Sequence, residues 1–192
     1  MKRGEMALGA LLLAAAGCDA PPQGAGAGGP APGPEVLEAW ETVYSVLQHP
    51  RCANCHPRDR RPTQGDDRVP HAQFVEGGAS GRGVPGLACA GCHRDSNLGP
   101  APLAPGAPGW RMPSERLGLV FQGRSSGELC RQLRDPRRNG GRTPEALLEH
   151  GATDGFVLWG WDPGDGRTPV PVPHDEFLRA LGTWIEGGCG CP

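Results

Sequence analysis

The chain of 192 residues has almost no lysine. Lys2 is the single lysine, and the arginines that supply the remaining positive charge are interspersed with acidic residues. The formal net charge is −2, and no basic stripe gives the electrostatic footprint of a nucleic-acid-binding protein. We therefore expect no nucleic-acid partner.

Aromatic residues are also scarce, at 5% of the chain, with a single tyrosine. Glycine (32 residues) and proline (22 residues) together exceed a quarter of the sequence, a range that is typical of loops and disorder. Few large apolar side chains give a poor core, because burial of apolar surface is the main force that stabilises a fold. The composition therefore predicts long loops and a core that needs apolar surface from another source.

No hydrophobic run is long enough to span a bilayer. The longest, Ala7–Gly17, follows the basic residues Lys2 and Arg3, which is the pattern of an export signal. Its end resembles a bacterial lipoprotein box and predicts a signal peptide at 1–17, with lipid on the thiol of Cys18 and a membrane-anchored lipoprotein facing the periplasm. Ordinary cleavage nearby, which would leave a soluble periplasmic protein, is the alternative.

After this signal, residues 18–34 consist mainly of glycine, proline and alanine without a hydrophobic period. We interpret them as a flexible tether whose ends lie roughly 20–25 Å apart. The folded domain is then expected at 35–192.

Two pentapeptides with the same pattern occur early in that domain. They read Cys52-Ala53-Asn54-Cys55-His56 and Cys89-Ala90-Gly91-Cys92-His93. C-x-x-C-H is the attachment signature of a c-type haem, because two thiols one turn apart add to the two vinyl groups of one porphyrin. The histidine that follows then lies under the iron as its proximal ligand. The sequence predicts two haem c groups, with thioethers from Cys52, Cys55, Cys89 and Cys92 and proximal ligands His56 and His93.

Two other classes of site use paired cysteines. A zinc ribbon also has two C-x2-C pairs, but zinc requires nothing of the residue after each pair, whereas both pairs here are followed by histidine. A thioredoxin-type pair needs a βαβ context, which this chain lacks. Two porphyrins also supply the apolar surface that the composition lacks. We therefore expect a mainly α, loop-rich fold, with cytochrome c-like helices wrapped around two covalently bound haems.

Periodicity and caps place the helices of this domain. Apolar residues recur at three- and four-residue steps through Leu37, Trp40, Tyr44 and Leu47. A capping box begins at Ser125, and Thr143 precedes a proline at a first helical position. The aromatic run 156–161 is interpreted as a wall of the second haem pocket, or alternatively as a buried strand. The predicted helices are 35–48, one from Ser125 to before Pro136, one from Thr143 to Gly151, and 175–186. The last of these has Phe177, Leu181 and Trp184 on one face, with Leu178 and Ile185 beside it.

An iron with a proximal histidine can take a second axial ligand on its distal side. Several residues qualify, and the residues alone leave the choice open. His49 is set aside, since it lies only three residues before Cys52. The distal candidates are His71, in the loop between the motifs; Met112, which precedes a proline; His150, near a helix end; and His174, beside a cap.

Three of the eight cysteines remain after lipid and haem are assigned, namely Cys130, Cys189 and Cys191. In an oxidising compartment one pair is expected to form a disulfide. A bridge between Cys189 and Cys191 would be strained. Pairing of Cys130 with either Cys189 or Cys191 stays open at this point.

The chain resembles a family of exported bacterial di-haem cytochrome c-like proteins over nearly everything after residue 35. Members are similar to electron carriers, and some are labelled the cytochrome subunit of an isoquinoline 1-oxidoreductase, a molybdenum hydroxylase. The matching segments are HPRCANCHP (49–57), PHAQFVEGG with GRGVPG and CAGCH (70–93), LCRQLRDPRRNGGRTPEALLEH (129–150), the aromatic run with PGDGRTPVP, and the terminal Cys-Pro.

This resemblance implies choices that the residues left open. The histidines that match His71 and His150 recur in the pattern, which implies that they are the distal ligands, with Met112 as the runner-up and His174 behind it. The family has a single terminal cysteine, matching Cys191, which implies a bridge between Cys130 and Cys191.

Together these features favour a lipid-anchored electron carrier that passes one electron per haem, or the cytochrome subunit of an oxidoreductase, over an enzyme in its own right. Its partner would be a redox protein, with a molybdenum hydroxylase or a respiratory chain as the candidates. One alternative is a di-haem peroxidase-like enzyme, in which one iron is open and has an acid-base group beside it. A haem-based sensor is the other.

Overall fold

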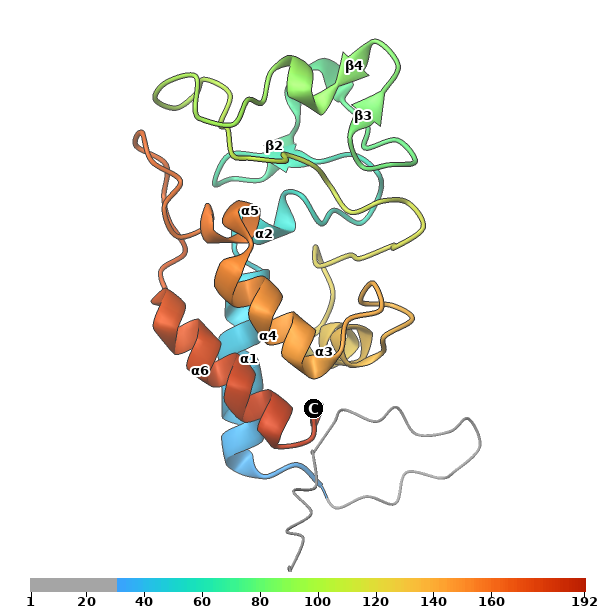
Figure 1. Cartoon of the computed structure of the whole chain (residues 1–192), viewed down its shortest axis with the longest axis vertical. Coiled ribbons are helices and arrows are strands. Elements are labelled where there is room, and N and C mark those ends of the chain that lie inside the picture. Colours follow the sequence, from blue (N-terminus) through green and yellow to red (C-terminus); the bar gives the residue numbers. More distant parts are fainter. Residues whose placement is uncertain (1–30) are drawn as a thin grey trace, which may run out of the picture.

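The computed structural model describes residues 31–192. The expected signal peptide, lipid attachment at Cys18 and most of the tether lie outside these residues. The described chain has a helical half and a loop-rich lobe, shown at the bottom and top of Figure 1. We call residues 57–113 the loop lobe; it contains all four short strands and the second pentapeptide.

The helices mostly begin where the sequence predicts, at N-caps or prolines. The elements are α1 (Pro34–Leu47), α2 (Pro50–Ala53), β1 (Thr63–Gln64), β2 (Val69–Pro70), the 3-10 turn η1 (Ala72–Phe74), β3 (Gly83–Val84), β4 (Leu87–Ala88), the 3-10 turn η2 (Cys89–Gly91), α3 (Ser126–Arg134), α4 (Pro144–Thr153), α5 (Gly155–Leu158) and α6 (His174–Glu186).

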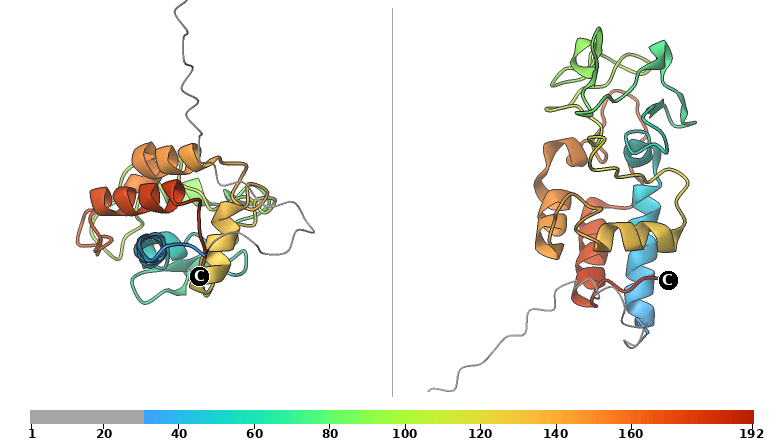
Figure 2. Two further views of the ribbon diagram at one scale, coloured as in Figure 1. Left: turned by 90° about the horizontal axis from the view of Figure 1, so that it is seen from below. Right: turned by 90° about the vertical axis from the view of Figure 1, so that its right-hand side faces the viewer.

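The core of the helical half lies between α1 and α6, which run in opposite directions side by side in both Figures 1 and 2. Trp40 of α1 and Trp184 of α6 are both 0% exposed, and their ring centroids lie 5.0 Å apart. Each indole N–H has a partner: the Trp40 N–H donates to Ser126 Oγ (2.8 Å) and the Trp184 N–H to the Gly190 carbonyl (2.9 Å). This pair therefore joins α1, α3, α6 and the chain end.

The buried face of α1 differs from the predicted one. The fully buried residues are Val36, Trp40, Val43 and Val46, whereas Leu37, Tyr44 and Leu47 are only partly buried. The face is rotated because α1 packs against α3 as well as α6. For α6, burial of Phe177, Leu181, Trp184 and Ile185 confirms the predicted face.

The capping box of α3 is confirmed. The Ser125 hydroxyl accepts from the Glu128 backbone N–H, and the Glu128 carboxylate accepts from the Ser125 backbone N–H at 2.9 Å. We expect Ser125→Ala to lower the free energy of unfolding by about 1 kcal/mol, because the first turn loses its side-chain acceptor. Urea unfolding of the purified protein would measure this loss. Ser45→Ala, at an exposed position in the last turn of α1, is the matched control; an equal loss there would contradict a capping effect.

Two expectations for residues 143–161 are wrong. Gly151 does not end α4, which continues to Thr153. It is instead buried against α6, where an added Cβ would lie 3.2 Å from the Phe177 ring, so the missing side chain allows the two helices to pack closely. The aromatic run is not a strand: it forms the short helix α5 and the turn after it, capped by the Asp154 side chain.

The loop lobe contains two hairpins that the sequence reasoning did not predict. Strand β1 pairs antiparallel with β2, and β3 pairs antiparallel with β4. The second hairpin turns at Pro85-Gly86, where Gly86 has φ +85°, the conformation that a type II turn requires at that position. The Pro-Gly dipeptide was the available signal.

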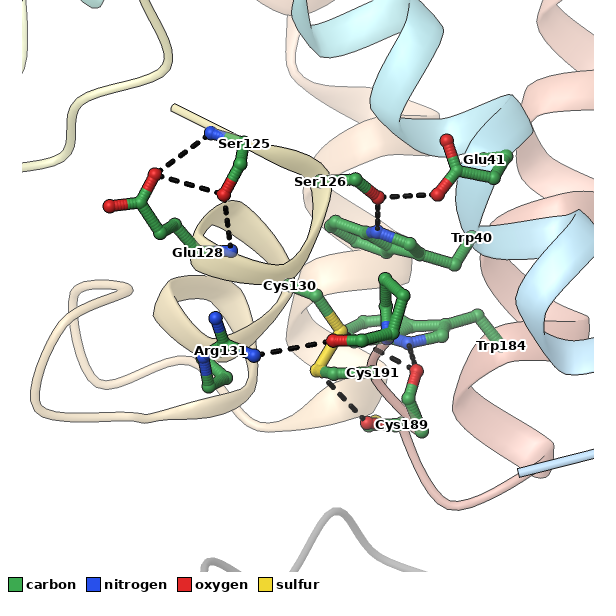
Figure 3. Close-up of a disulfide and its surroundings, with 12 residues drawn as sticks. Trp40, Glu41, Ser125, Ser126, Glu128, Cys130, Arg131, Trp184, Cys189 and Cys191 are labelled. Atoms are coloured by element: carbon green, nitrogen blue, oxygen red, sulfur yellow. Dashed lines mark hydrogen bonds between the residues drawn. A yellow bond between two sulfur atoms is a disulfide. The ribbon is translucent and has the colours of Figure 1, made fainter. Parts of the chain in front are cut away.

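In the structure, Cys130 of α3 is joined to Cys191 by a disulfide, with the two Cα atoms 5.6 Å apart. This is the pairing that the family resemblance implies. Figure 3 shows the bridge beside the Trp184 indole, with Cys189 next to it. Cys130 and Cys189 are both fully buried. The bridge therefore attaches the chain end to α3 in the core of the helical half.

Candidate functional site

The two pentapeptides share one backbone hydrogen bond, although the first lies at the end of α2 and the second in η2. In the first, Cys55 N–H donates to the Cys52 carbonyl (3.2 Å), and in the second, Cys92 N–H donates to the Cys89 carbonyl (3.2 Å). A bond between residues i and i+3 brings their side chains to the same side of the turn. Each motif therefore presents two thiols together, as attachment to one porphyrin requires. None of these four cysteines forms a disulfide in the described structure.

The motifs lie close to each other, although 33 residues separate Cys55 from Cys89. Burial raises the pKa of the Cys55 thiol to about 12, and the nearby Cys89 contributes to that rise. The pKa of Cys52 is likewise raised to about 12, by burial first and by Cys55 second. In the unmodified chain these thiols are protonated near neutral pH.

His56, the last residue of the first motif, is held at two points. Its Nδ1 donates to the Leu119 carbonyl (3.1 Å), and its ring stacks on Phe121 at 3.8 Å with 6° between the planes. The Phe121 backbone N–H also donates to the His56 carbonyl (3.0 Å). Burial lowers the pKa of His56 to about 4, so the ring is neutral, as a metal ligand must be.

His93, the last residue of the second motif, is held in the same manner. Its Nδ1 donates to the Pro105 carbonyl (2.7 Å), and its ring stacks on Trp110 at 4.3 Å with 3° between the planes. Burial lowers the pKa of His93 too. In both motifs, Nδ1 is used by a carbonyl and Nε2 is left for another ligand.

His71 faces the second motif. Its ring centroid lies 6.0 Å from that of His93, with 64° between the planes, and its Nδ1 donates to the Ala72 carbonyl (2.6 Å). Two imidazoles that bind one metal through Nε2, with bonds of about 2 Å, have ring centres roughly 6 Å apart. The spacing of these two histidines therefore fits a shared iron.

His150 lies on the side of the first motif. It is close enough to His56 for a charge on His150 to lower the pKa of His56. Its Nδ1 lies 3.2 Å from the Asp154 carboxylate, which is also 3.8 Å from Arg111. A histidine that ligates a metal almost always donates its other ring N–H to a carbonyl or carboxylate. His56, His93, His71 and His150 all follow this rule, which leaves the Nε2 atom of each ring for a metal.

The other candidates are engaged elsewhere in the described structure. His174 uses Nε2, the atom a ligand needs, to donate to the Gly151 carbonyl (2.9 Å) and so joins α6 to α4. His49 caps α2 through Nδ1. Met112 is buried, donates its backbone N–H to the Gly81 carbonyl (2.8 Å) and has its sulfur against Gly77. We therefore leave these three residues out of the proposed ligand set.

The aromatic run 156–161 lies behind the second motif. Phe156 and Trp159 each contact the edge of Trp110 at 5.1 Å, and Trp110 stacks on His93. The Arg51 guanidinium, beside the first motif, lies 5.7 Å from the centre of the Trp159 ring. A continuous series of side chains thus joins the two motifs.

Phe121 and Trp110 are site residues that the sequence reasoning missed. Neither lies on a periodic helix face, and the carbonyls of Leu119 and Pro105 have no sequence signature. The available signal was the scarcity of aromatic residues, which makes each one outside a helix worth assigning.

In residues 31–192, no cluster of three or more His, Cys, Asp or Glu side chains is placed to hold a metal ion. Within the same residues, no helix is sufficiently long and apolar to cross a bilayer. No protein-family model, curated protein or solved structure matches the chain.

Proposed function

We propose that this protein is a di-haem c-type cytochrome that transfers single electrons. The first haem would be held by Cys52 and Cys55, with His56 and His150 as axial ligands. The second would be held by Cys89 and Cys92, with His93 and His71. The observation that supports this most is the proximity of His71 and His93, whose ring centroids lie 6.0 Å apart and whose Nδ1 atoms both donate to carbonyls.

Haem iron supplies reversible one-electron oxidation and reduction, at a potential set by its axial ligands and surroundings. The residues of this chain would hold both axial positions, which favours electron transfer over binding of an exogenous ligand. The carbonyls of Leu119, Pro105 and Ala72 fix the histidine tautomers, since a carbonyl accepts only from a protonated Nδ1. These contacts support the proposed ligands, because each leaves the Nε2 atom unprotonated for a metal.

The place of action and the partner are also proposals. The export signal and the lipoprotein-like box favour a membrane-anchored protein facing the periplasm, which agrees with covalent haem attachment outside the cytoplasm. The partner would be a redox protein; a molybdenum hydroxylase or a respiratory chain is the candidate suggested by the resemblance.

Intact mass and electronic and paramagnetic spectra of the exported holo-protein test the proposal. We expect two covalent haems, both six-coordinate and low-spin, with no sulfur-to-iron charge-transfer band. His71→Ala should convert one haem to high-spin, and His150→Ala the other, because each change removes one axial ligand. His174→Ala is the matched control and should leave both haems low-spin. Bare thiols in the wild-type protein, or a sulfur-to-iron band, would contradict the proposed site.

One observation favours a second candidate, a di-haem peroxidase-like enzyme. The contact of His150 with Asp154, beside Arg111, is an arrangement that acid-base chemistry at an open iron could use. This candidate predicts that the first haem is high-spin in the wild type and that the protein turns over peroxide. It also predicts that Asp154→Asn lowers that turnover, whereas the electron carrier has none to lose.

A further inference from the structure

Each motif histidine has an aromatic ring stacked on its face. Binding of a metal through Nε2 does not by itself require this contact. Phe121 stacks on His56 with 6° between the planes, and Trp110 stacks on His93 with 3°. Both supports come from the irregular segment between η2 and α3, but they are different aromatic residue types. A nearly parallel aromatic contact at both motif histidines therefore indicates that Phe121 and Trp110 have the same structural role.

A hydrogen bond at Nδ1 alone leaves the imidazole ring of each motif histidine able to rotate. The side-chain torsion χ2 of histidine is broad, so a ring held by one Nδ1 bond can still swing about that bond. A flat ring against its face opposes this motion. The bond to Leu119 or Pro105 sets the tautomer, and the stacked ring sets the plane.

Both stacked rings are themselves held firmly. Phe121 is 6% exposed, its backbone N–H donates to the His56 carbonyl (3.0 Å), and its carbonyl accepts from Gln48 (2.8 Å). Trp110 makes T-shaped contacts with Phe156 and Trp159, and Arg51 lies over Trp159 with its side chain only 7% exposed. A rigid support of this kind is needed to keep a ligand in one orientation.

We propose that Phe121 and Trp110 are positioning residues, which fix the planes of the two proximal imidazoles before iron is bound. This inference rests on the proposed function and adds how its ligands are oriented. The orientation of an axial imidazole affects the paramagnetic spectrum of a low-spin haem, which therefore reports on these two rings separately from haem content.

The test uses the exported holo-protein and pairs each variant with a control. Trp110→Leu should shift the g-values of one low-spin signal, and Phe121→Leu those of the other. Trp110→Phe and Phe121→Tyr retain a ring and should restore the wild-type signals. The controls are Trp161→Leu and Phe177→Leu, which remove aromatic rings that contact His174 and neither motif histidine; both signals should stay unchanged.

The outcomes separate this inference from the proposed function. Unchanged g-values in both leucine variants, or equal shifts in the controls, would overturn the positioning role while two haems are still counted by mass. Absence of covalent haem in the wild type would overturn the proposed function, and the positioning role with it. If Trp110→Leu does not accumulate, Phe121→Leu against Phe177→Leu decides the question.

Discussion

Replacing Cys52 and Cys55 together by alanine is expected to leave one covalent haem, where two are proposed for the wild type. The two thiols are the atoms that would form the thioethers of the first motif, and the common turn of the motif places them side by side. Without them, His56 would remain as an axial ligand but could not hold a porphyrin covalently. Intact mass should fall by one haem, and haem absorbance per polypeptide should fall by half.

Three further variants make this experiment decisive. Cys89→Ala with Cys92→Ala should remove the other haem, with the same mass change. Cys130→Ala with Cys191→Ala removes two thiols outside the motifs and should leave both haems in place. If the double variant is degraded, the single change Cys52→Ala, which retains one thioether, is measured in its place. Two haems in the double variant would refute the assignment of the first motif.

Trp184→Ala is expected to lower the free energy of unfolding by about 3–5 kcal/mol, the usual loss for a buried aromatic side chain. Trp184 is 0% exposed, contacts Trp40 and donates its N–H to the Gly190 carbonyl. Proteins of this size are stable by roughly 5–15 kcal/mol, so this one change would remove a large part of the total. Chemical denaturation followed by circular dichroism would measure the loss.

The expected loss is specific to the helical half. Trp184→Phe keeps an aromatic ring in the core and should cost less than the alanine variant, about 1–3 kcal/mol for the unpaired Gly190 carbonyl. Both variants should still carry two haems, since the partners of Trp184 are the Trp40 ring and the Gly190 carbonyl, which lie outside both motifs. A loss below about 1 kcal/mol for Trp184→Ala would show that this tryptophan is not central to the core.

Local signals in the sequence predicted the helices well. The capping box at Ser125, the Thr143-Pro144 start and the apolar face of α6 each depend on residues within one or two turns, and the structure confirms all three. The errors in the predicted helix boundaries occur where contact with a segment distant in the sequence determines the local structure. Glycine is a residue type that commonly ends a helix, but at Gly151 α6 packs against the chain and α4 continues past it.

The composition also predicted how much of the chain would be loop. The loop lobe contains long irregular segments and two short hairpins, in a chain rich in glycine and proline. The number of haems and the wrapping of the helices around them remain predictions. They depend on the motif, and the matching Nδ1 contacts of four histidines support them.

The sequence by itself determined the chemistry that each motif offers, because two thiols and a histidine within five residues form one local turn. It also determined where most helices begin, since caps and prolines act on the first turn. Only the tertiary structure decided that His71 faces His93, that His150 lies on the side of His56, and that Phe121 and Trp110 stack on the motif histidines. These contacts join residues 17 to 94 positions apart, and no local periodicity encodes such pairs; they form when the core and the loop lobe pack together.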